Sequence, residues 1–397
     1  MTLSVARTFS AVVTLGDECY GEVGPFPVEP AWWAEVGPVG DRLESELGVP
    51  VTVLRLLTVE GGDGARDGHV TYHVEAASAP RAALRPAVFT VSDERLRLPW
   101  ASAAGVRELL AWASSVVPVT GRPRLHKSWN LAALFRLSID GGVAWLKATP
   151  PFAADEAAAI AVVGSVDPGL VPRVLASAPG RVILADIPGE DLWNASDAQV
   201  TSTITRFVTA QAALAAGDGL AAGPAGAMRG GLLDRRSNVL AEQVERLLEG
   251  PVAAEIGPEA LARVRALRPR WGALEACGLP DTLVHGDFHP GNWRGAPGEQ
   301  PVVLDFADAY WGNPVQDGLR AIDYLPRARR DTARRAWVEA WRAAAPGSDP
   351  ETALRVAGPL AHLAYAVRYQ EFLDGIEPSE RVYHAGDPAA VIRHALA

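Results

Sequence analysis

Hydrophobic and polar positions alternate through the first half of the chain and follow helical spacing through most of the second half. Alternation predicts a strand over residues 5–15. It also predicts a hairpin whose strands, 51–60 and 69–77, flank the loop GGDGARDG at 61–68. Between them, residues 30–47 open with proline and continue with amphipathic spacing, which favours a helix.

A second group of elements follows residue 98. Residues 98–117 have the spacing of a helix, and 130–149 read as two apolar strands joined at Asp140-Gly141, a strong hairpin signal. A helix over 151–164 has Asp155 and Glu156 in its first turn, where acidic side chains suit the helix dipole. A strand begins at Arg181 and runs into a Pro-Gly break.

The remainder is mostly helical in pattern. Gly358-Pro359 is expected to break the last of these helices, and the Ala- and Gly-rich segment 218–231 is expected to be an irregular loop. The predicted helices cover residues 196–216, 236–249, 258–276, 328–345 and 351–373.

This order of elements predicts three parts. Residues 1–98 form an accessory α/β module without a catalytic constellation, for which a packing or capping role is expected. Residues 99–188 form a β-rich lobe and residues 189–397 a helical lobe, with a cleft between the lobes. The expected fold class is α+β, and no internal repeats occur.

Composition narrows the class of protein. A hydrophobic fraction of 48% supports folded cores, and a net charge of −10 argues against a nucleic-acid partner. No signal peptide and no run of eighteen apolar residues occurs, so no membrane association is expected. Cys19 and Cys277 form no metal or disulfide framework, which favours a cytoplasmic location. The oligomeric state is not fixed by the sequence.

The richest chemistry lies in VHGDFHPGNWRGAPGEQPVVLDF, residues 284–306. On a strand, His285, Asp287 and His289 would face one side, and with Asp305 they could bind zinc or iron in a metal hydrolase. Pro290-Gly291 ends any such strand at once, which counts against this hypothesis.

Phosphoryl transfer accounts for more of these residues. It needs a carboxylate beside the acceptor hydroxyl and oxygen ligands for a divalent metal. In protein kinases the sequence H-R-D-x-x-x-x-N precedes a metal-binding aspartate. His285, Asp287 and Asn292 have that spacing, and Asp305 follows in an apolar strand.

HGDFHPGN followed by LDFADAYWGNPVQDG resembles the Brenner motif of aminoglycoside phosphotransferases and choline kinase-like small-molecule kinases. The resemblance covers about residues 101–397 and implies a two-lobed, protein-kinase-like fold with an extra N-terminal module. It implies that Asp287 is the catalytic base and that Asn292 and Asp305 bind Mg²⁺. His285 and Asp317 would support the loop, and His289 would pack within it.

The resemblance also implies a nucleotide site for ATP or GTP. Lys147 would hold the phosphates, oriented by Glu156, with Asp155 as a rival partner. No glycine-rich loop precedes Lys147; instead, Ser128, Trp129 and Asn130 are expected to form a turn over the phosphates. Backbone groups at Asp186 and Ile187 would meet the purine.

The acceptor is expected over Asp287, walled by C-terminal helices. His362, Tyr365 and Tyr369 share one helix face, and packing is at least as common a role for such a face as substrate contact. Trp311 is expected to pack under the metal-binding loop. The candidate substrate residues are Asp308, Asp323, His362, Tyr365, Arg368, Tyr369 and Glu371.

These observations predict a kinase that transfers the γ-phosphoryl group of ATP or GTP to a hydroxyl of an antibiotic such as an aminoglycoside. The alternative is a sugar or metabolite kinase, since the N-terminal extension is similar to that of capped, maltokinase-like sugar kinases. A nucleotide-binding pseudokinase and a metal hydrolase are the remaining hypotheses.

Overall fold

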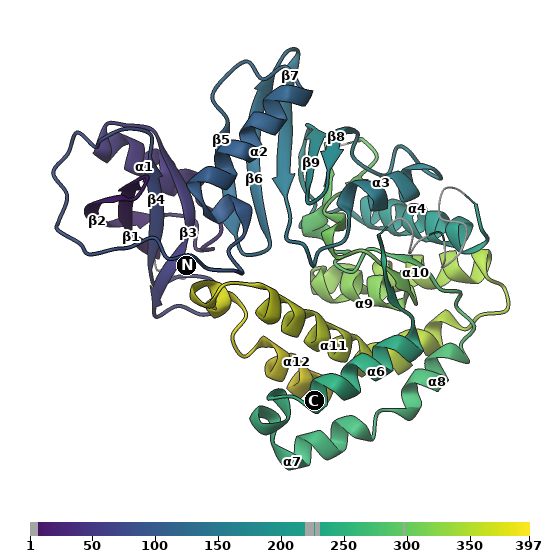
Figure 1. Ribbon diagram of the computed structural model, residues 1–397. Helices are drawn as coiled ribbons and strands as arrows, with labels where there is room; N and C mark the ends of the chain where they lie inside the picture. The colour runs from purple at the N-terminus through teal and green to yellow at the C-terminus, as the bar shows by residue number, and fades with distance from the viewer. Residues whose placement is uncertain (1–6, 219–225, 227–230, 297) are drawn as a thin grey trace. The chain divides into compact units, whose positions relative to one another are not determined.

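The computed structural model describes residues 7–218, 226, 231–296 and 298–397 (Figure 1). Its contacts divide the chain into two compact units, each assembled from separate segments. Unit 1 comprises residues 1–152, 175–186 and 372–385, and unit 2 comprises residues 153–174, 187–371 and 386–397.

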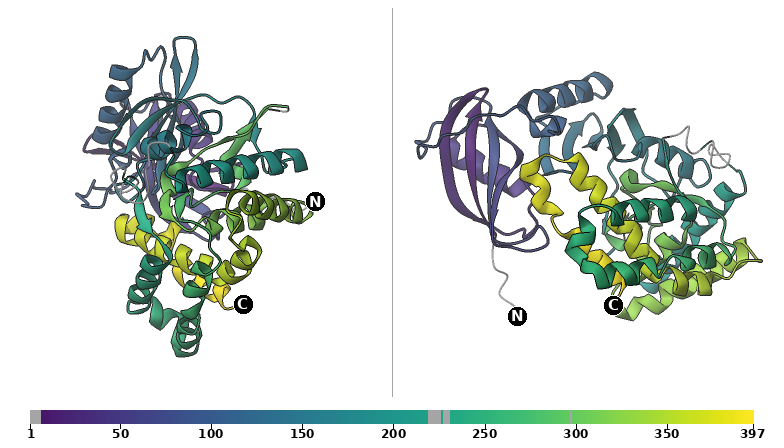
Figure 2. Two further views of the ribbon diagram at one scale, coloured as in Figure 1. Left: turned by 90° about the vertical axis from the view of Figure 1, so that its right-hand side faces the viewer. Right: turned by 60° about the horizontal axis from the view of Figure 1, so that its bottom comes forward.

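Unit 1 begins with a four-stranded sheet and one helix. The strand order is β2-β1-β4-β3, with β1 and β4 parallel and the other pairs antiparallel; the right-hand view of Figure 2 shows the strands side by side. The predicted strand β1 and hairpin β3–β4 are confirmed. The elements are β1 (Arg7–Leu15), β2 (Glu18–Val28), α1 (Gly37–Leu47), β3 (Val51–Glu60) and β4 (His69–Ala76).

One expectation for this sheet was wrong, and one of its strands was not predicted. Helix α1 begins at Gly37 instead of residue 30, because Arg7 donates to the carbonyls of Trp32 and Glu35 and holds the preceding chain out of a helix. Strand β2, which contains two prolines, was not predicted. Proline is tolerated at the edge of a sheet, and β2 is an edge strand.

A five-stranded sheet in the order β5-β6-β7-β9-β8 completes the β structure of unit 1. Val106, Leu109 and Ala113 of α2 pack with Phe135 and Leu146 of the sheet, so the helix covers one of its faces (Figure 1). The hairpin at Asp140-Gly141 is confirmed. The elements are η1 (Pro99–Ala101), α2 (Ala103–Val116), β5 (Arg124–Trp129), β6 (Ala132–Ile139), β7 (Gly142–Ala148), β8 (Val174–Ala178) and β9 (Arg181–Ala185).

Residues 372–385, which include the end of α11 and η4 (Pro378–Tyr383), belong to unit 1. Tyr383 is buried in the same apolar cluster as Trp33, and Glu377 accepts hydrogen bonds from Arg55 at 2.9 Å and Arg97 at 3.0 Å. The sequence placed this segment in the helical lobe. The functional division at residues 98 and 188 stays a prediction.

Unit 2 is mainly helical, with two small three-stranded sheets ordered β10-β13-β14 and β11-β15-β12. Helix α10 packs along α4, and α12 along α7 (Figures 1 and 2). The helices are α3 (Glu156–Gly164), α4 (Asp197–Ala215), α6 (Ser237–Leu248), α7 (Val252–Arg265), α8 (Pro269–Glu275), α9 (Val315–Tyr324), α10 (Arg327–Ala344), α11 (Pro350–Gly375) and α12 (Asp387–Ala395). The shorter elements are β10 (Glu190–Asp191), β11 (Leu233–Arg235), β12 (Thr282–Val284), η2 (Pro290–Asn292), β13 (Trp293–Gly295), β14 (Val302–Val303), η3 (Phe306–Asp308) and β15 (Tyr310–Gly312).

Two predicted helix boundaries in unit 2 were also wrong. The helix expected over 258–276 is divided between α7, which is kinked at Gly257, and α8, which starts at Pro269. Conversely, α11 runs through Pro359 without a break. The loop expected at 218–231 lies mostly outside the described residues. In the described part of the chain, every helix is too short or too polar to cross a membrane.

Candidate active site

The HGD loop, residues 285–292, follows β12 and is held in place by aromatic packing. Phe288 is 1% exposed and stacks on Phe207 of α4 with ring centroids 4.5 Å apart. Trp293, directly after the loop, is fully buried and packs on Phe288. These apolar anchors fix the loop backbone, so that its polar side chains keep defined positions.

His285 is fully buried, and both of its ring nitrogens form hydrogen bonds with backbone groups. Nε2 lies 2.8 Å from the carbonyl oxygen of Leu304, to which it donates, and Nδ1 accepts from the backbone N–H of Asp287 at 3.2 Å. Burial lowers the pKa of His285, so the ring is neutral. A ring bonded in this way has no nitrogen left for a metal or a substrate proton.

Asp317 braces the loop from the first turn of α9. Its two carboxylate oxygens accept from the backbone N–H groups of His285 at 2.9 Å and Gly286 at 3.0 Å, and from Nε2 of Gln211 at 2.9 Å. Burial raises the pKa of Asp317 to about 7 even though these three donors favour the carboxylate. The side chain thereby satisfies backbone donors that the sharp turn at Gly286 leaves without a partner in secondary structure.

Asp287 is surrounded by donors. Oδ1 accepts from Arg320, whose Nη2 lies 2.6 Å away, and Oδ2 accepts from Asn292 Nδ2 at 3.1 Å and His289 Nε2 at 3.2 Å. Burial by itself would raise the pKa of Asp287, but Arg320 and His289 outweigh it and hold the pKa well below its usual range. The side chain is 26% exposed, so an ionised carboxylate remains accessible from solvent.

His289 forms the middle of an aromatic stack. Its ring lies 5.2 Å from that of Trp193 and 5.0 Å from that of Tyr324, both nearly parallel to it. Nδ1 accepts from the backbone N–H of Gly291 at 3.0 Å, which leaves Nε2–H to donate to Asp287. A Cβ on Gly291 would come within 2.3 Å of Trp193, so only glycine lets this tryptophan lie against the loop. Trp193 and Tyr324 are 43% and 42% exposed.

Arg320, Tyr324 and Trp193 were missed as site residues by the sequence reasoning. The Arg320 guanidinium lies 3.8 Å from the ring centroid of Tyr324 and 4.8 Å from that of Tyr365. Asp317, Arg320 and Tyr324 recur at i, i+3 and i+7 on α9. This spacing from Asp317 could have revealed Arg320 and Tyr324. Trp193 comes from a separate segment and carries no comparable signal.

Asn292 and Asp305 provide the oxygen donors that Mg²⁺ prefers. The Asn292 side-chain nitrogen donates to the carbonyl and carboxylate oxygens of Asp287. The oxygen of the same amide group is the candidate metal ligand. The Leu304 N–H donates to the Asn292 carbonyl at 2.8 Å and joins the two segments. Asp305 has left-handed backbone angles, φ 65° and ψ 63°, which are uncommon for a residue with a side chain. A carboxylate and an amide oxygen fit a hard divalent cation.

Lys147 and Glu156 lie in different units, so their ion pair stays a prediction. Lys147 is 8% exposed, in the middle strands of the unit 1 sheet. Glu156 Oε1 accepts from the backbone N–H of Phe306 at 3.2 Å, directly after Asp305. Asp155, the expected rival, is the N-cap of α3 and accepts from Ala158.

The turn expected over the nucleotide phosphates is buried in unit 1. Ser128 and Trp129 are the last residues of β5 rather than part of the turn, which begins at Asn130. The Ser128 side chain faces the Leu54 carbonyl at 3.5 Å, and Asn130 is fully buried. This burial favours a supporting role for both side chains, and their nucleotide contact stays a prediction.

The expected purine-binding segment spans the position in the sequence where a segment of unit 1 ends at Asp186 and unit 2 resumes at Ile187. Asp186 is exposed and accepts from the Trp145 indole N–H at 2.7 Å. The Ile187 carbonyl accepts from Arg294 Nε at 2.8 Å.

Some of the candidate acceptor residues meet the HGD loop. The Tyr365 hydroxyl donates to the Gly286 carbonyl at 3.3 Å. Tyr369 is largely enclosed, and burial raises its pKa to about 12. Asp308 accepts from Arg368 Nη2 at 2.7 Å, and a Cβ on Gly286 would come within 2.3 Å of the Asp308 carbonyl.

The other candidates have different surroundings. The His362 ring packs 6.0 Å from that of His394, and Asp323 is exposed on α9. Trp311 is 1% exposed, which confirms its expected packing role.

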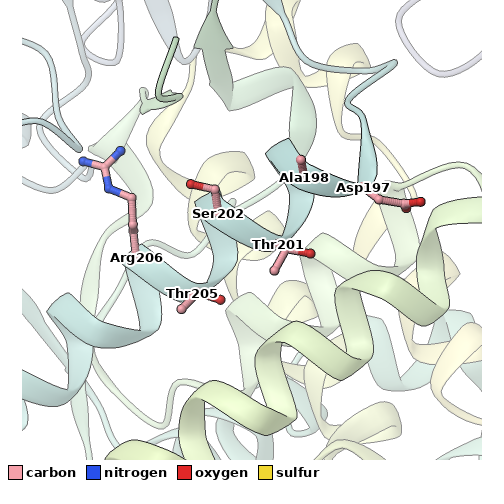
Figure 3. A pocket seen from close by; sticks show the side chains of 6 residues that line it. All are labelled: Asp197, Ala198, Thr201, Ser202, Thr205 and Arg206. Carbon is pink, nitrogen blue, oxygen red and sulfur yellow. The ribbon is translucent and has the colours of Figure 1, made fainter. Parts of the chain in front are cut away.

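A shallow hollow of about 530 Å³ lies along α4 (Figure 3). Its lining comes from that helix alone and includes no residue of the HGD loop, so it is a surface feature distinct from the candidate site. The lining residues are Asp197, Ala198, Thr201, Ser202, Thr205 and Arg206.

A metal-hydrolase site finds no support in this geometry. Among the described residues, no group of three or more His, Cys, Asp or Glu side chains is placed to hold a metal ion. Since His285 is engaged at both nitrogens, the trio expected for zinc is not assembled.

Solved structures share this architecture. An ethanolamine kinase from Plasmodium vivax is 10% identical with a TM-score of 0.51, covering 70% of this chain and 82% of its own. A choline kinase from Cryptosporidium parvum is 11% identical with a TM-score of 0.50, covering 73% and 94%. A macrolide 2'-phosphotransferase from Brachybacterium faecium is 21% identical with a TM-score of 0.47, covering 72% and 97%. No curated protein matches the sequence.

The likenesses to the ethanolamine kinase and the choline kinase confirm the α+β, protein-kinase-like fold. The family evidence comes from the sequence itself, because the model of the phosphotransferase enzyme family matches residues 135–355, over half of the chain. The match includes Lys147, the HGD loop, Asp305 and the whole of α9. The chain therefore belongs to the phosphotransferase enzyme family, whose members transfer a phosphoryl group to a hydroxyl.

Proposed function

We propose that this small-molecule kinase transfers the γ-phosphoryl group of ATP or GTP to an acceptor hydroxyl placed against Asp287. The observation that carries the proposal is the ionised, accessible Asp287 carboxylate on a loop braced by Asp317 and by buried aromatic rings. Phosphoryl transfer depends mainly on positioning and charge neutralisation, and such a loop supplies both.

In this mechanism, Asp287 accepts a hydrogen bond from the acceptor hydroxyl and directs its oxygen toward the phosphorus. Its low pKa makes it a weak base while the hydroxyl is intact. In a loose transition state the hydroxyl becomes acidic only as the new bond forms, so a late proton transfer to Asp287 suffices. His289, Asn292 and Arg320 fix both carboxylate oxygens and thereby the direction of this hydrogen bond.

Asn292 and Asp305 would hold Mg²⁺, which neutralises charge on the phosphate oxygens when bound. The left-handed backbone of Asp305 and the amide orientation of Asn292 support this assignment. Glu156 accepts a hydrogen bond from the backbone N–H of Phe306, directly after Asp305, and so holds this segment in place.

For the nucleotide, we propose that Lys147 binds the phosphates and that Glu156 is its ion-pair partner. Asp186 and Ile187 would present backbone groups to the purine, and Ser128 and Asn130 would support the turn beside the phosphates. In this proposal residues 99–188 bind the nucleotide, residues 189–397 carry the catalytic loop, and residues 1–98 are accessory.

Two acceptor classes follow from the sequence resemblance. One is an antibiotic such as an aminoglycoside, and the other is a sugar or related metabolite. Both are substrates with hydroxyl groups, and the mechanism above applies to each without change.

The test measures nucleotide consumption with Mg²⁺ and ATP or GTP across aminoglycosides, macrolides, hexoses, amino sugars and choline, with mass spectrometry for the added phosphoryl group. Asp287→Asn should lower kcat about 10²- to 10⁴-fold while nucleotide affinity is retained. Asp331→Asn, an exposed aspartate on α10, is the matched control and should leave kcat unchanged.

Normal turnover by Asp287→Asn would overturn the assignment. Nucleotide binding by the intact chain without transfer to any acceptor would instead indicate a pseudokinase.

A further inference from the structure

Three acidic side chains around the HGD loop are each paired with an arginine of the same unit. Asp287 is paired with Arg320 at 2.6 Å, and Asp308 with Arg368 at 2.7 Å. Glu371 is paired with Arg368 at 3.0 Å and also with Arg235. The surface beside Asp287 therefore offers little uncompensated negative charge to a cationic acceptor.

Two aromatic rings beside Asp287 are occupied by a cation in the same way. The Arg320 guanidinium lies over the rings of both Tyr324 and Tyr365, which is the geometry of a cation–π contact. Arginine stays protonated under all working conditions, so this positive charge is permanent. An ammonium group brought to Asp287 would meet a fixed guanidinium that it cannot displace without loss of these contacts.

Two partly exposed aromatic rings lie close to Asp287. Trp193 and Tyr324 each stack on His289, and their side chains are 43% and 42% exposed. Such surfaces suit a ring with an apolar face and polar edges. Asp323 is a further acid of α9 and lies exposed.

We propose that the acceptor is an uncharged, polyhydroxylated ring of the sugar type, and that Arg320 is the residue that excludes cationic acceptors. This inference rests on the proposed kinase function and selects one of its two acceptor classes. The acceptor ring lies against Trp193 with one hydroxyl on Asp287. Polycationic acceptors such as aminoglycosides are disfavoured by the permanent charge of Arg320.

The test compares neutral with charged acceptors. Glucose differs from glucosamine and from glucuronate in a single charged group, and maltose against kanamycin extends the comparison to a polycation. For each, kcat/KM is measured with Mg²⁺ and saturating nucleotide. The wild-type chain should prefer the neutral member over the ammonium-bearing member by at least about tenfold, the ratio that a modest charge interaction produces.

Variants at position 320 separate charge from packing. Arg320→Gln should reduce the neutral-to-cationic ratio about tenfold, whereas Arg320→Lys should retain it because the charge is kept. A purely structural role would lower kcat/KM for all acceptors and leave the ratio unchanged. Arg334→Gln, which removes an exposed arginine with its own ion pair to Glu351, is the control and should match the wild type.

Three results would overturn the inference: a wild-type preference for glucosamine, glucuronate or kanamycin; an unchanged ratio in Arg320→Gln; or no turnover of any neutral sugar. Failure of the proposed function itself looks different, because then no acceptor of either class would be phosphorylated. Phosphorylation of kanamycin alone would thus refute the acceptor class and uphold the kinase.

Discussion

Asp305 combines a functional side chain with an unfavourable backbone. Its left-handed φ of 65° is suited to glycine, yet the proposed role needs a carboxylate. The residue therefore costs stability at the position where function requires it.

We expect Asp305→Gly and Asp305→Ala both to lose nearly all turnover, with the glycine variant more stable by roughly 1 kcal/mol because only glycine relieves the backbone. Urea denaturation of the two variants measures the difference. Equal stabilities would mean that the backbone at this position is not strained.

Asp317→Asn should destabilise the HGD loop although it preserves shape. One oxygen that accepts from a backbone N–H becomes an NH₂ group, which leaves a buried donor unsatisfied at a cost of about 1–3 kcal/mol. We expect a lower melting temperature and a reduced kcat, with nucleotide affinity retained. Unchanged stability would argue that the bracing bonds are replaceable.

The sequence located much of this site because spacing within one segment reports on local geometry. Asp287 and Asn292 are five residues apart, and the structure joins them by a hydrogen bond. Trp193 reaches the loop only through the packing of a distant segment against Gly291, and no pattern in the sequence indicates that contact.

Among elements, helix α3 links capping to the proposed site. Asp155 caps the helix and Glu156, next to it, bonds the segment after Asp305. The sequence favoured Glu156 over Asp155 as the partner of Lys147, and the structure gives the two acids different partners.

Asp155→Ala should lower the free energy of unfolding by about 1 kcal/mol through loss of the cap, while Asp155→Ser should restore it. Thermal denaturation and kcat are measured together. A loss of turnover in Asp155→Ala far beyond its loss of stability would revive Asp155 as the partner of Lys147.

Hairpins and amphipathic helices were predictable because their signals are local. In unit 1, the departures from prediction occurred where distant contacts override local preference. Arg7 binds the carbonyls of Trp32 and Glu35 and delays α1, and β2 becomes a strand only because β1 provides an edge for it.

At the scale of the whole molecule, the ionic cluster of Arg55, Arg97, Glu377 and Glu380 holds residues 372–385 in unit 1. Burial raises the pKa of Glu380 to about 8, with a further increase from Glu377 that Arg55 and Arg97 oppose. No local pattern predicts this cluster, because Arg55 and Glu377 are 322 positions apart.

Glu380 should make stability depend on pH. The folded chain keeps this proton up to about pH 8, whereas the unfolded chain releases it near 4.5, so the folded state binds more protons between these values. The free energy of unfolding should then fall as pH rises through this window, by at most roughly 1.4 kcal/mol per unit, and level off above it. Glu380→Gln should remove the contribution of Glu380 to this slope in urea titrations at several pH values, whereas the contribution of Asp317, whose pKa is also raised by burial, should remain. An unchanged slope would place the proton elsewhere.

The late position of Glu377 also sets an order of events during synthesis. At typical rates of about 5–20 residues per second, the ribosome needs roughly 16–64 seconds to pass from Arg55 to Glu377. Once residues 1–98 have been made, and until Glu377 follows, Arg55 and Arg97 lack their carboxylate partner and the module lacks Tyr383 from its core. Its folding is thus tied to translation of a segment 322 positions downstream, and a ribosome stalled before that segment leaves an incomplete module exposed to chaperones and proteases.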